Sequence, residues 1–305
     1  MLLFESNSQV VTNTPFLPVG NSADARSAAL SNAVVALDND INALFFNPAT
    51  LYTSEKRDLS FTFLKNISDI NSGSAVYSND ELINTGGVWA VSSNFTDFGS
   101  FEYANQFGLR NGGTFGAQNF NIGISHSNEL DSNLYWGGTV RYLYAGLEQN
   151  SSSAMVVDAG LLYEFSDNRS IVGLSLLNAG FVLNTFDGAD ESITPDLRVG
   201  FSHRLQGMPL LFNIALYRLL DQQESFWTRF GNIAVGGEFE IGDYIRLRGG
   251  YDFYTSSNLS AESQSTFSGF SFGAGGEFKD FDINLSINQY GSEVLFGRIS
   301  LNMDI

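Results

Sequence analysis

The stretch DFDINLSIN, residues 280–288, alternates between two kinds of side chain. Apolar residues occupy every second position, at Phe281, Ile283, Leu285 and Ile287, and polar residues fill the positions between. Successive side chains of a β-strand point to opposite faces of the sheet, so the pattern predicts a strand with one apolar and one polar face. The apolar face packs either on the core of a soluble sandwich or against lipid. The function depends on which of these it is.

The composition differs from that of an ordinary soluble domain. Charged residues make up 16% of the 305-residue chain, against roughly 25% in typical soluble proteins, and aromatic residues reach 14%. The net charge of −18 argues against binding to nucleic acid, which needs clustered Lys and Arg. The absence of cysteine excludes a disulfide framework. No apolar run approaches the ~18–20 residues of a transmembrane helix, so a membrane role would have to use strands.

Segments of period 2 run almost continuously from Asp58 to the end of the chain. We therefore predict a fourteen-stranded antiparallel transmembrane β-barrel over residues 58–305. Most of its strands are close to the ~9–11 residues that a tilted strand needs to cross a bilayer. The expected strands are 58–65, 86–95, 99–108, 118–127, 133–146, 153–165, 170–178, 195–205, 209–219, 230–241, 245–255, 267–278, 280–289 and 293–304.

The connections between these strands alternate in length. Short connections, such as 96–98 and 242–244, fall on one rim. The other rim carries long polar segments, at 66–85, 109–117, 179–194, 220–229 and 256–266. Outer-membrane barrels have short turns on one side and longer loops on the other, whereas a soluble Greek-key sandwich has no reason to sort its loops in this way. The pattern indicates a bacterial outer-membrane protein.

Charges within the expected strands fall mainly on one parity, which we assign to the lumen. They are Asp158, Glu164, Asp196, Arg198, Glu238, Glu240, Arg246, Arg248, Asp252, Glu277 and Arg298. The opposite parity carries Leu197, Val199, Phe201, Ile233, Val235, Phe239, Ile245, Leu247, Phe270, Phe272, Ile299 and Leu301. An Arg facing lipid costs about 2–4 kcal/mol at the bilayer midplane, which would enforce this segregation. The apolar face is therefore expected to face lipid.

Four of the lumen charges flank one tight turn and fix its register. Two acids precede the turn and two bases follow it, at Glu238, Glu240, Arg246 and Arg248. If all four line the lumen, Glu240 lies opposite Arg246 across a three-residue loop, which is an allowed hairpin. These lumen ion pairs are expected either to form a gate or ligand-binding ladder, or to neutralise one another in a closed lumen.

The first 57 residues predict a short helical plug inside the barrel. SADARSAALSNAVVAL is rich in small, helix-compatible residues, and DNDINALFFNPATL opens with a capping cluster and stops at Asn47-Pro48. The opening residues MLLFESNSQ lack the basic and apolar regions of a secretory signal. Either a signal has been removed or the protein is not exported.

Residues 15–51, PFLPVGNSADARSAALSNAVVALDNDINALFFNPATL, resemble the PorV/PorQ family, relatives of the FadL-type fourteen-stranded barrels. The matching plug motif comprises Arg26 in an A-R-x-x-A-L element, Asp38 and Asp40 in a run similar to V-A-L-x-D-D, and Asn47, Pro48 and Ala49 in an N-P-A signature. Further similarity lies at 176–219, closer to the PorQ branch, and between 236 and 278.

This resemblance implies a non-catalytic outer-membrane subunit of the type IX secretion system of Bacteroidetes-like bacteria. Its implied partners are other secretion-system proteins, namely translocon, cargo or surface attachment subunits, together with outer-membrane lipid or lipopolysaccharide. It also implies an alternative, the transport of hydrophobic small molecules by a FadL-like barrel. The charge-rich lumen expected from the sequence favours the docking subunit, and a soluble β binding protein is a third hypothesis.

One motif could be read as a metal site. Asp38, Asp40 and Asn42 have the spacing that opens an EF-hand loop, but Ala43 and Ala49 stand where that loop needs its Gly and its bidentate Glu. We therefore expect helix capping here. The two histidines lack the spacing of a zinc site. No catalytic constellation remains, so we expect neither an enzyme nor a cofactor.

Overall fold

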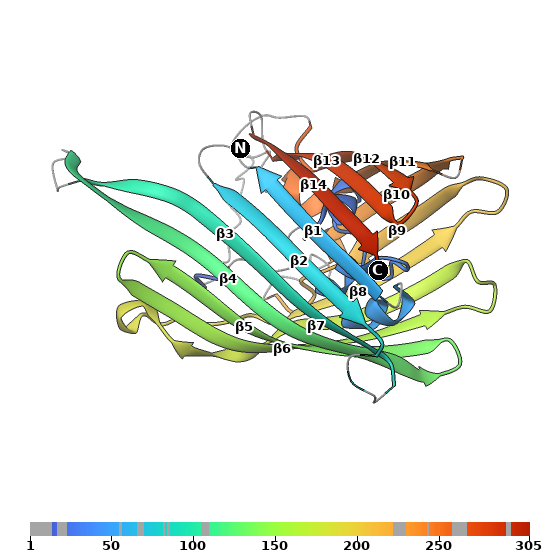
Figure 1. Ribbon diagram of the computed structural model, residues 1–305, viewed down its shortest axis with the longest axis horizontal. Helices are drawn as coiled ribbons and strands as arrows, with labels where there is room; N and C mark the ends of the chain where they lie inside the picture. Colours follow the sequence, from blue (N-terminus) through green and yellow to red (C-terminus); the bar gives the residue numbers. More distant parts are fainter. Residues whose placement is uncertain are drawn as a thin grey trace, which may run out of the picture.

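In the computed structural model the strands form one closed antiparallel barrel, and part of the N-terminal region lies inside it (Figure 1). The structure describes residues 14–16, 23–54, 57–65, 70–81, 83, 86–104, 110–221, 230–242, 244–257, 267–290 and 294–305. Each of the fourteen strands pairs with its sequence neighbour, and the first pairs with the last. The predicted fold class is confirmed.

The strands differ widely in length. They are β1 (Arg57–Lys65), β2 (Asn71–Asn79), β3 (Val88–Ala104), β4 (Arg110–Asp131), β5 (Leu134–Leu147), β6 (Asn150–Glu164), β7 (Ser170–Asn184), β8 (Asp196–Arg204), β9 (Leu210–Leu216), β10 (Ile233–Ile241), β11 (Ile245–Asp252), β12 (Phe270–Phe278), β13 (Phe281–Tyr290) and β14 (Val294–Asp304). The short helices α1 (Ala25–Ala29), η1 (Ile41–Phe45) and η2 (Pro48–Thr53) precede them, and η3 (Phe186–Gly188) follows β7. None of the described helices is long and apolar enough to span a membrane.

The alternating stretch that includes β13 has its apolar face on the outside. Ile283, Leu285 and Ile287 are 49%, 51% and 57% exposed, respectively. Between them, Asn284 and Ser286 are buried, at 0% and 3% exposure. A soluble sandwich would reverse this arrangement. The apolar face of the strand therefore faces lipid, which answers the question that the sequence raised.

The same segregation holds around the barrel. Of the residues expected to face lipid, those that are at least one third exposed are Val199, Phe201, Phe239, Ile245, Leu247, Phe270, Phe272 and Ile299, and the remaining four are half-buried. The expected lumen charges are buried or half-buried, apart from Glu277, which is exposed at the end of β12. An apolar wall around a closed barrel is the architecture of outer-membrane proteins, so we place this chain in the bacterial outer membrane.

The number of strands was predicted correctly, but through two errors that cancel. The first is β2, which lies within the expected loop 66–85. Its outward positions include Gly73 and Ala75, which pair with Phe63 and Phe61 of β1, so its own alternation is weak. A Cβ on Gly73 would collide with the ring of Phe95 on β3. Large side chains of the neighbouring strands thus cover this part of the wall, and β2 needs few apolar residues of its own.

The second error concerns β3, which was expected as two strands separated by a turn at 96–98. The structure has a single strand with a register shift between Asp97 and Ser100. Gly99 lies inside the shift with φ +77°, a conformation that favours glycine. A β-bulge therefore accommodates the turn-like sequence TDFGS without ending the strand. The expected loop 109–117 is likewise not a loop, because β4 begins at Arg110.

The connections are sorted between the two rims of the barrel as predicted, from β6 to β13. The long connections 185–195, 217–232 and 253–269 share one rim, here called the loop rim. The short turns 205–209 and 279–280 share the other, the turn rim, where the chain ends. Longer loops lie on the outside of the cell in outer-membrane barrels, so the loop rim is taken to face outward.

Residues 23–54, here called the lumen segment, lie inside the barrel (Figure 1, blue). The helix α1 contacts β12 and β13, and η2 contacts β4, β5 and β6. The main apolar core is formed chiefly by this segment, with Leu30, Val34, Leu37, Ile41, Leu44, Phe45, Phe46 and Leu51 among its members. Most of the residues expected in the plug before position 23 lie outside the described part of the chain.

The lipid-facing wall can be tested by placing a charge at two depths. Leu285→Arg, in the middle of β13, is expected to lower the free energy of unfolding by about 2–4 kcal/mol, because the guanidinium would sit in hydrocarbon. Tyr244→Arg, at the turn rim, should cost less than about 1 kcal/mol. Denaturant unfolding of the protein in lipid vesicles measures both. Equal costs at the two depths would contradict a lipid-facing wall.

Candidate functional site

Three side chains of the lumen segment cap its helices. Asp24 accepts a hydrogen bond of 2.8 Å from the backbone N–H of Arg26 at the start of α1. Asp40 accepts one of 2.9 Å from Asn42 at the start of η1. Asn47 does the same for Ala49 at 3.1 Å, with Pro48 opening η2. The motif residues Asp40, Asn47, Pro48 and Ala49 therefore shape the fold of this segment locally.

Arg26 is the centre of the contact between the lumen segment and the barrel wall. Its guanidinium forms a two-pronged pair with Glu238 of β10, with both N–O distances 2.9 Å. Its remaining terminal nitrogen reaches the Asn39 carbonyl at 3.0 Å and Asp40 at 3.4 Å. Arg248 of β11 donates to the same Glu238 carboxylate. The two arginines and Glu238 form a buried triad that joins plug to wall, a contact that sequence reasoning did not foresee.

Burial of so many charges requires that they neutralise one another. The side chains of Glu238 and Arg248 are 1% and 0% exposed, so each would be strongly destabilising without its partner. Burial opposes the charge on Arg26, but the carboxylates of Glu238 and Asp40 more than compensate and raise the pKa of Arg26. Burial, together with the neighbouring Asp24, raises the pKa of Asp40 to about 7. Asp40 thus titrates near neutral pH.

The four residues of the expected ladder of lumen ion pairs have the predicted register, but only one of the two cross-strand ion pairs forms. Glu238 lies opposite Arg248, and Glu240 lies opposite Arg246. The first two form an ion pair. Arg246 instead pairs with Glu277 and Asp282 of the next hairpin.

Glu240 is 3.7 Å from Arg204, which also donates to Asp38 at 2.9 Å. The motif residue Asp38 therefore joins the lumen segment to β8 near the turn rim. Asp38 and Asp40 are engaged by different arginines, and Asp40 also caps η1. The Asp38 carboxylate thus binds the barrel wall, and the Asp40 carboxylate binds Arg26 and caps η1.

Asn47 joins two parts of the chain that are far apart in sequence. Its amide donates to the carbonyls of Val35 at 2.9 Å and Leu161 of β6 at 3.0 Å. A Cβ on Gly160 would overlap the Asn47 side chain, and one on Gly137 would overlap the backbone of Pro48. Glycines in the wall thus provide the space that the N-P-A turn occupies. This close approach explains part of the high glycine content.

Lumen-facing serines hold the backbone of the lumen segment. Ser74, Ser175 and Ser202, on three different strands, each donate at 2.7 Å to a carbonyl of the segment, at Ala23, Phe46 and Ala36, respectively. Asn288 of β13 donates to Ala28 at the same distance. The lumen-facing serines and asparagines thus hydrogen-bond backbone carbonyls of the lumen segment, most of which lie outside its short helices.

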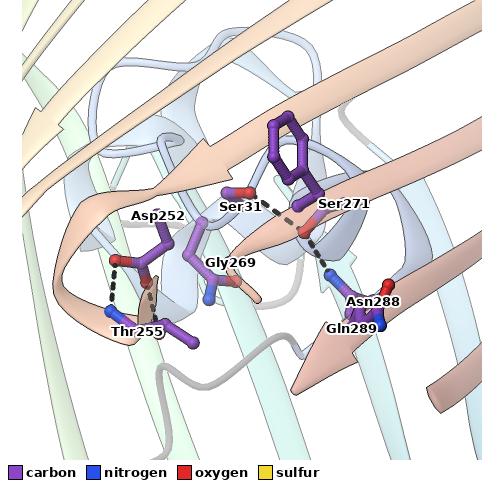
Figure 2. A pocket seen from close by; sticks show the side chains of 9 residues that line it. Ser31, Asp252, Thr255, Gly269, Ser271, Asn288 and Gln289 are labelled. Carbon is purple, nitrogen blue, oxygen red and sulfur yellow. Dashed lines mark hydrogen bonds between the residues drawn. The ribbon is translucent and has the colours of Figure 1, made fainter. Parts of the chain in front are cut away.

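A small polar pocket lies between the lumen segment and β11–β13 (Figure 2). Ser31 and Ser271 are joined at 2.9 Å, and Asn288 donates to Ser271 at 2.6 Å. On the opposite side, Asp252 accepts from the Thr255 hydroxyl at 3.0 Å. These groups already satisfy one another, and the space is of the order of a water molecule. The pocket offers no chemistry beyond solvation.

The loop-rim end of β5 and β6 has a different lining. Most buried side chains there are apolar and include Phe16, Leu143, Ala145, Ala154 and Val156, with Val182, Phe186 and Ile193 packed against them. The buried Ser152 of β6 donates to Glu191 of the connection 185–195 at the edge of this group. We call these residues the upper apolar cluster. A buried ion pair of 2.7 Å between Arg141 and Asp158 lies below it on the same strands. Sequence reasoning missed this cluster, although YLYA at 142–145 and AMVV at 154–157 break the alternation and signal it.

The chain matches no model of a protein family, and comparison with curated proteins gives no match either. Solved structures do match. A FadL homologue from Pseudomonas aeruginosa has a TM-score of 0.57 and 12% identity, covering 95% of this chain and 99% of that one. The Pseudomonas putida toluene transporter TodX has a TM-score of 0.57 and 12% identity, covering 92% of this chain and 96% of that one.

These matches define the class of protein: a fourteen-stranded outer-membrane barrel with the fold of the FadL homologues. At 12% identity the likeness concerns the fold alone. Membership of the PorV/PorQ family stays a prediction from the motif residues.

The buried triad gives a matched pair of variants. Glu238→Gln should lower the free energy of unfolding by about 3–5 kcal/mol, because it leaves two buried arginines without their shared counter-charge. Glu240→Gln should cost less than about 1 kcal/mol, since its side chain is 42% exposed and its pair with Arg204 is long. Urea unfolding followed by tryptophan fluorescence measures both. Similar costs for the two would show that the triad does not anchor the segment.

The raised pKa of Asp40 predicts a pH dependence of stability. An aspartate in an unfolded chain has a pKa of about 3.9, whereas that of Asp40 in the folded protein is about 7. Between these values the folded state binds more protons, so this group's contribution to stability falls as pH rises from about 4 to about 7 and is constant above. Urea titrations should therefore show that the free energy of unfolding falls more between pH 5 and pH 8 in the wild type than in Asp40→Asn. A larger loss in the variant would contradict the assignment.

Proposed function

We propose that this protein is a non-catalytic outer-membrane barrel that takes up hydrophobic small molecules from outside the cell. The observation that carries the proposal is the upper apolar cluster. Around the lumen segment, the apolar side chains of the wall pack against those of the segment itself, whereas Phe16 is the one described N-terminal residue in the upper apolar cluster. Apolar side chains on the lumen side of two strands instead favour a ligand with little polar surface.

The position of the cluster supports uptake from the loop rim. The cluster lies at the ends of β5 and β6 that meet that rim, and the ion pair Arg141–Asp158 separates it from the level of the lumen segment. Phe186 and Ile193 come from the long connection 185–195, so a loop forms part of its lining. A molecule arriving from outside would meet the upper apolar cluster, with Ser152 and Glu191 at its edge, before it met the buried ion pair Arg141–Asp158.

The fold comparisons support the same class of function. One matched structure is that of a toluene transporter. The fold alone does not transfer a substrate, and no residue is carried over from that protein. We infer the size of the ligand from the upper apolar cluster, whose side chains come mainly from two strands and one loop. An aromatic hydrocarbon or a short acyl chain has the matching chemistry.

A second candidate is a docking subunit of the type IX secretion system, which is the function implied by the resemblance of residues 15–51. The observation that favours it is the filling of the lumen. The lumen segment is held by the buried triad, by serines from several strands and by Asn47 against wall glycines. A scaffold that binds translocon, cargo or attachment proteins through its loops, in a membrane of lipid and lipopolysaccharide, needs no open conduit.

A ligand-binding measurement separates the two candidates. Radiolabelled toluene should bind saturably to the purified protein in detergent, and Phe186→Ala should weaken that binding at least tenfold by removing an aromatic wall of the cluster. The matched control Phe165→Ala, at the turn rim, should leave binding unchanged.

Absence of saturable binding by the wild type would refute hydrophobic uptake. Co-purification with a large outer-membrane translocon or a surface attachment complex would then favour the secretion subunit. Equal losses in the two Phe variants would show that the upper apolar cluster is not the binding site.

A further inference from the structure

The strands β3 and β4 continue well past their neighbours at the loop rim. They have 17 and 22 residues, whereas about 9–11 suffice to cross a bilayer. On one side, β2 stops where Asn71 pairs with Asp97. On the other, β5 stops where Leu147 pairs with Ala117. Residues 100–104 and 110–116 therefore form a two-stranded ribbon that projects from the barrel (Figure 1). The connection 105–109 lies outside the described residues.

In the described part of the chain, the outer edge of β4 in this ribbon is not paired with another strand. The carbonyl of Gly116 turns away from β3 and accepts from the N–H of Glu148, in the β5–β6 turn, at 3.0 Å. Backbone groups of alternate residues in a strand point to the same edge, so those of Thr114 point the same way. Beyond the turn at 148–149, no described strand reaches this edge.

The bulge at Gly99 reverses which side chains of β3 face inward. Before it, Phe95 lies opposite Phe120 on the outer wall, and after it Phe101 lies opposite Phe115. Phe115 has the parity of the lumen-facing residues of β4. Its ring lies 5.5 Å from that of Phe101 and 5.1 Å from that of Tyr103. The ribbon thus carries an aromatic face, of which Phe101 is 44% exposed.

A ribbon of this kind is incomplete by itself. A two-stranded hairpin is marginal in water, and three strands with an apolar face are needed for stability. Two polar contacts brace it at its base and edge: the Tyr103 hydroxyl donates to Glu148 at 2.5 Å, and Arg110 pairs with Glu102 at 2.7 Å on the exposed face. Neither supplies a third strand or covers the aromatic rings.

We infer that the edge of β4 at 110–115 is a docking site for an extended segment of another protein outside the cell, which adds to the ribbon as a third strand. The backbone of the segment would pair with the free edge, and its alternate apolar side chains would lie beside Phe115 and Phe101. The chain has a net charge of −18 and Glu148 lies beside the edge, whereas Glu102 is already paired with Arg110. Lys or Arg therefore fits the positions of the partner segment next to Glu148. The inference holds whether or not the lumen transports a ligand.

The strand-addition geometry can be tested in cells that make the full chain. A photo-crosslinking phenylalanine analogue is placed at Arg110 or at Thr114. The two sites should attach to the same polypeptide at points four residues apart, as mass spectrometry of the adducts would show, because paired strands keep a fixed register. The matched control is Gln118, whose neighbour position is filled by Gly146 of β5 and which should yield no such adduct.

A proline variant tests the backbone pairing itself. Thr114→Pro removes an N–H that points to the free edge and none that points to β3, so the adduct formed from position 110 should fall at least tenfold. Thr114→Ala should keep it. Heat-modifiable migration in gels checks that both variants form the barrel, and toluene binding checks the lumen separately. Adducts only to lipid, only to a second copy of this chain, or without the four-residue spacing would overturn the inference, as would the absence of any adduct.

Discussion

Hydrocarbon offers no hydrogen-bond partner to a peptide group, and this constraint underlies the rest of the structure. It forces the strands to close, so that β1 pairs with β14 and no edge meets lipid. Once the barrel is closed, every second side chain of each strand points into the lumen. Charged and polar side chains are tolerated there only if they are paired, because a buried polar group without a partner is costly. The lumen segment provides those partners: Ser74, Ser175 and Ser202 bind its carbonyls, and Glu238 binds Arg26.

The strength of that packing bears on what the barrel can transport. Burying about 150–200 Å² of a small apolar ligand yields roughly 4–5 kcal/mol. Separating Arg26 from Glu238 would leave a buried charge without its partner, which costs about 3–5 kcal/mol. The loss of the apolar contacts of Leu30, Leu37 and Phe46 would add to this cost. Ligand binding at the upper apolar cluster alone therefore cannot displace the whole lumen segment. A transported molecule would have to pass beside the segment or through the wall.

Much of the fold could be predicted from the sequence because lipid imposes a strict rule on alternation. The rule identified the lipid-facing parity of β8 and β10–β14 and the register that places Glu240 opposite Arg246. It failed at β2, where neighbouring Phe rings cover Gly73, and at Gly99, where a bulge mimics a turn. Pairing in the lumen was harder still. Arg246 pairs with Glu277 and not with Glu240, which lies opposite it. Arg26 pairs with Glu238, 212 positions away in the sequence. Such lumen contacts depend on the tertiary packing of the plug and not on the local sequence pattern.

The two candidate functions place opposite demands on one element. Uptake requires a path beside the lumen segment or through the wall, whereas docking requires only that the segment stay in place. The buried triad, the serine contacts and the wall glycines all hold the lumen segment in place and so favour docking. The upper apolar cluster would favour uptake, yet it is confined to one side of the barrel and lies outside the lumen segment. A barrel that is firmly closed at one level and apolar above it can bind a hydrophobic molecule without conducting it. Binding and conduction are therefore separate questions for this protein, and the position of the buried triad relative to the cluster is what separates them.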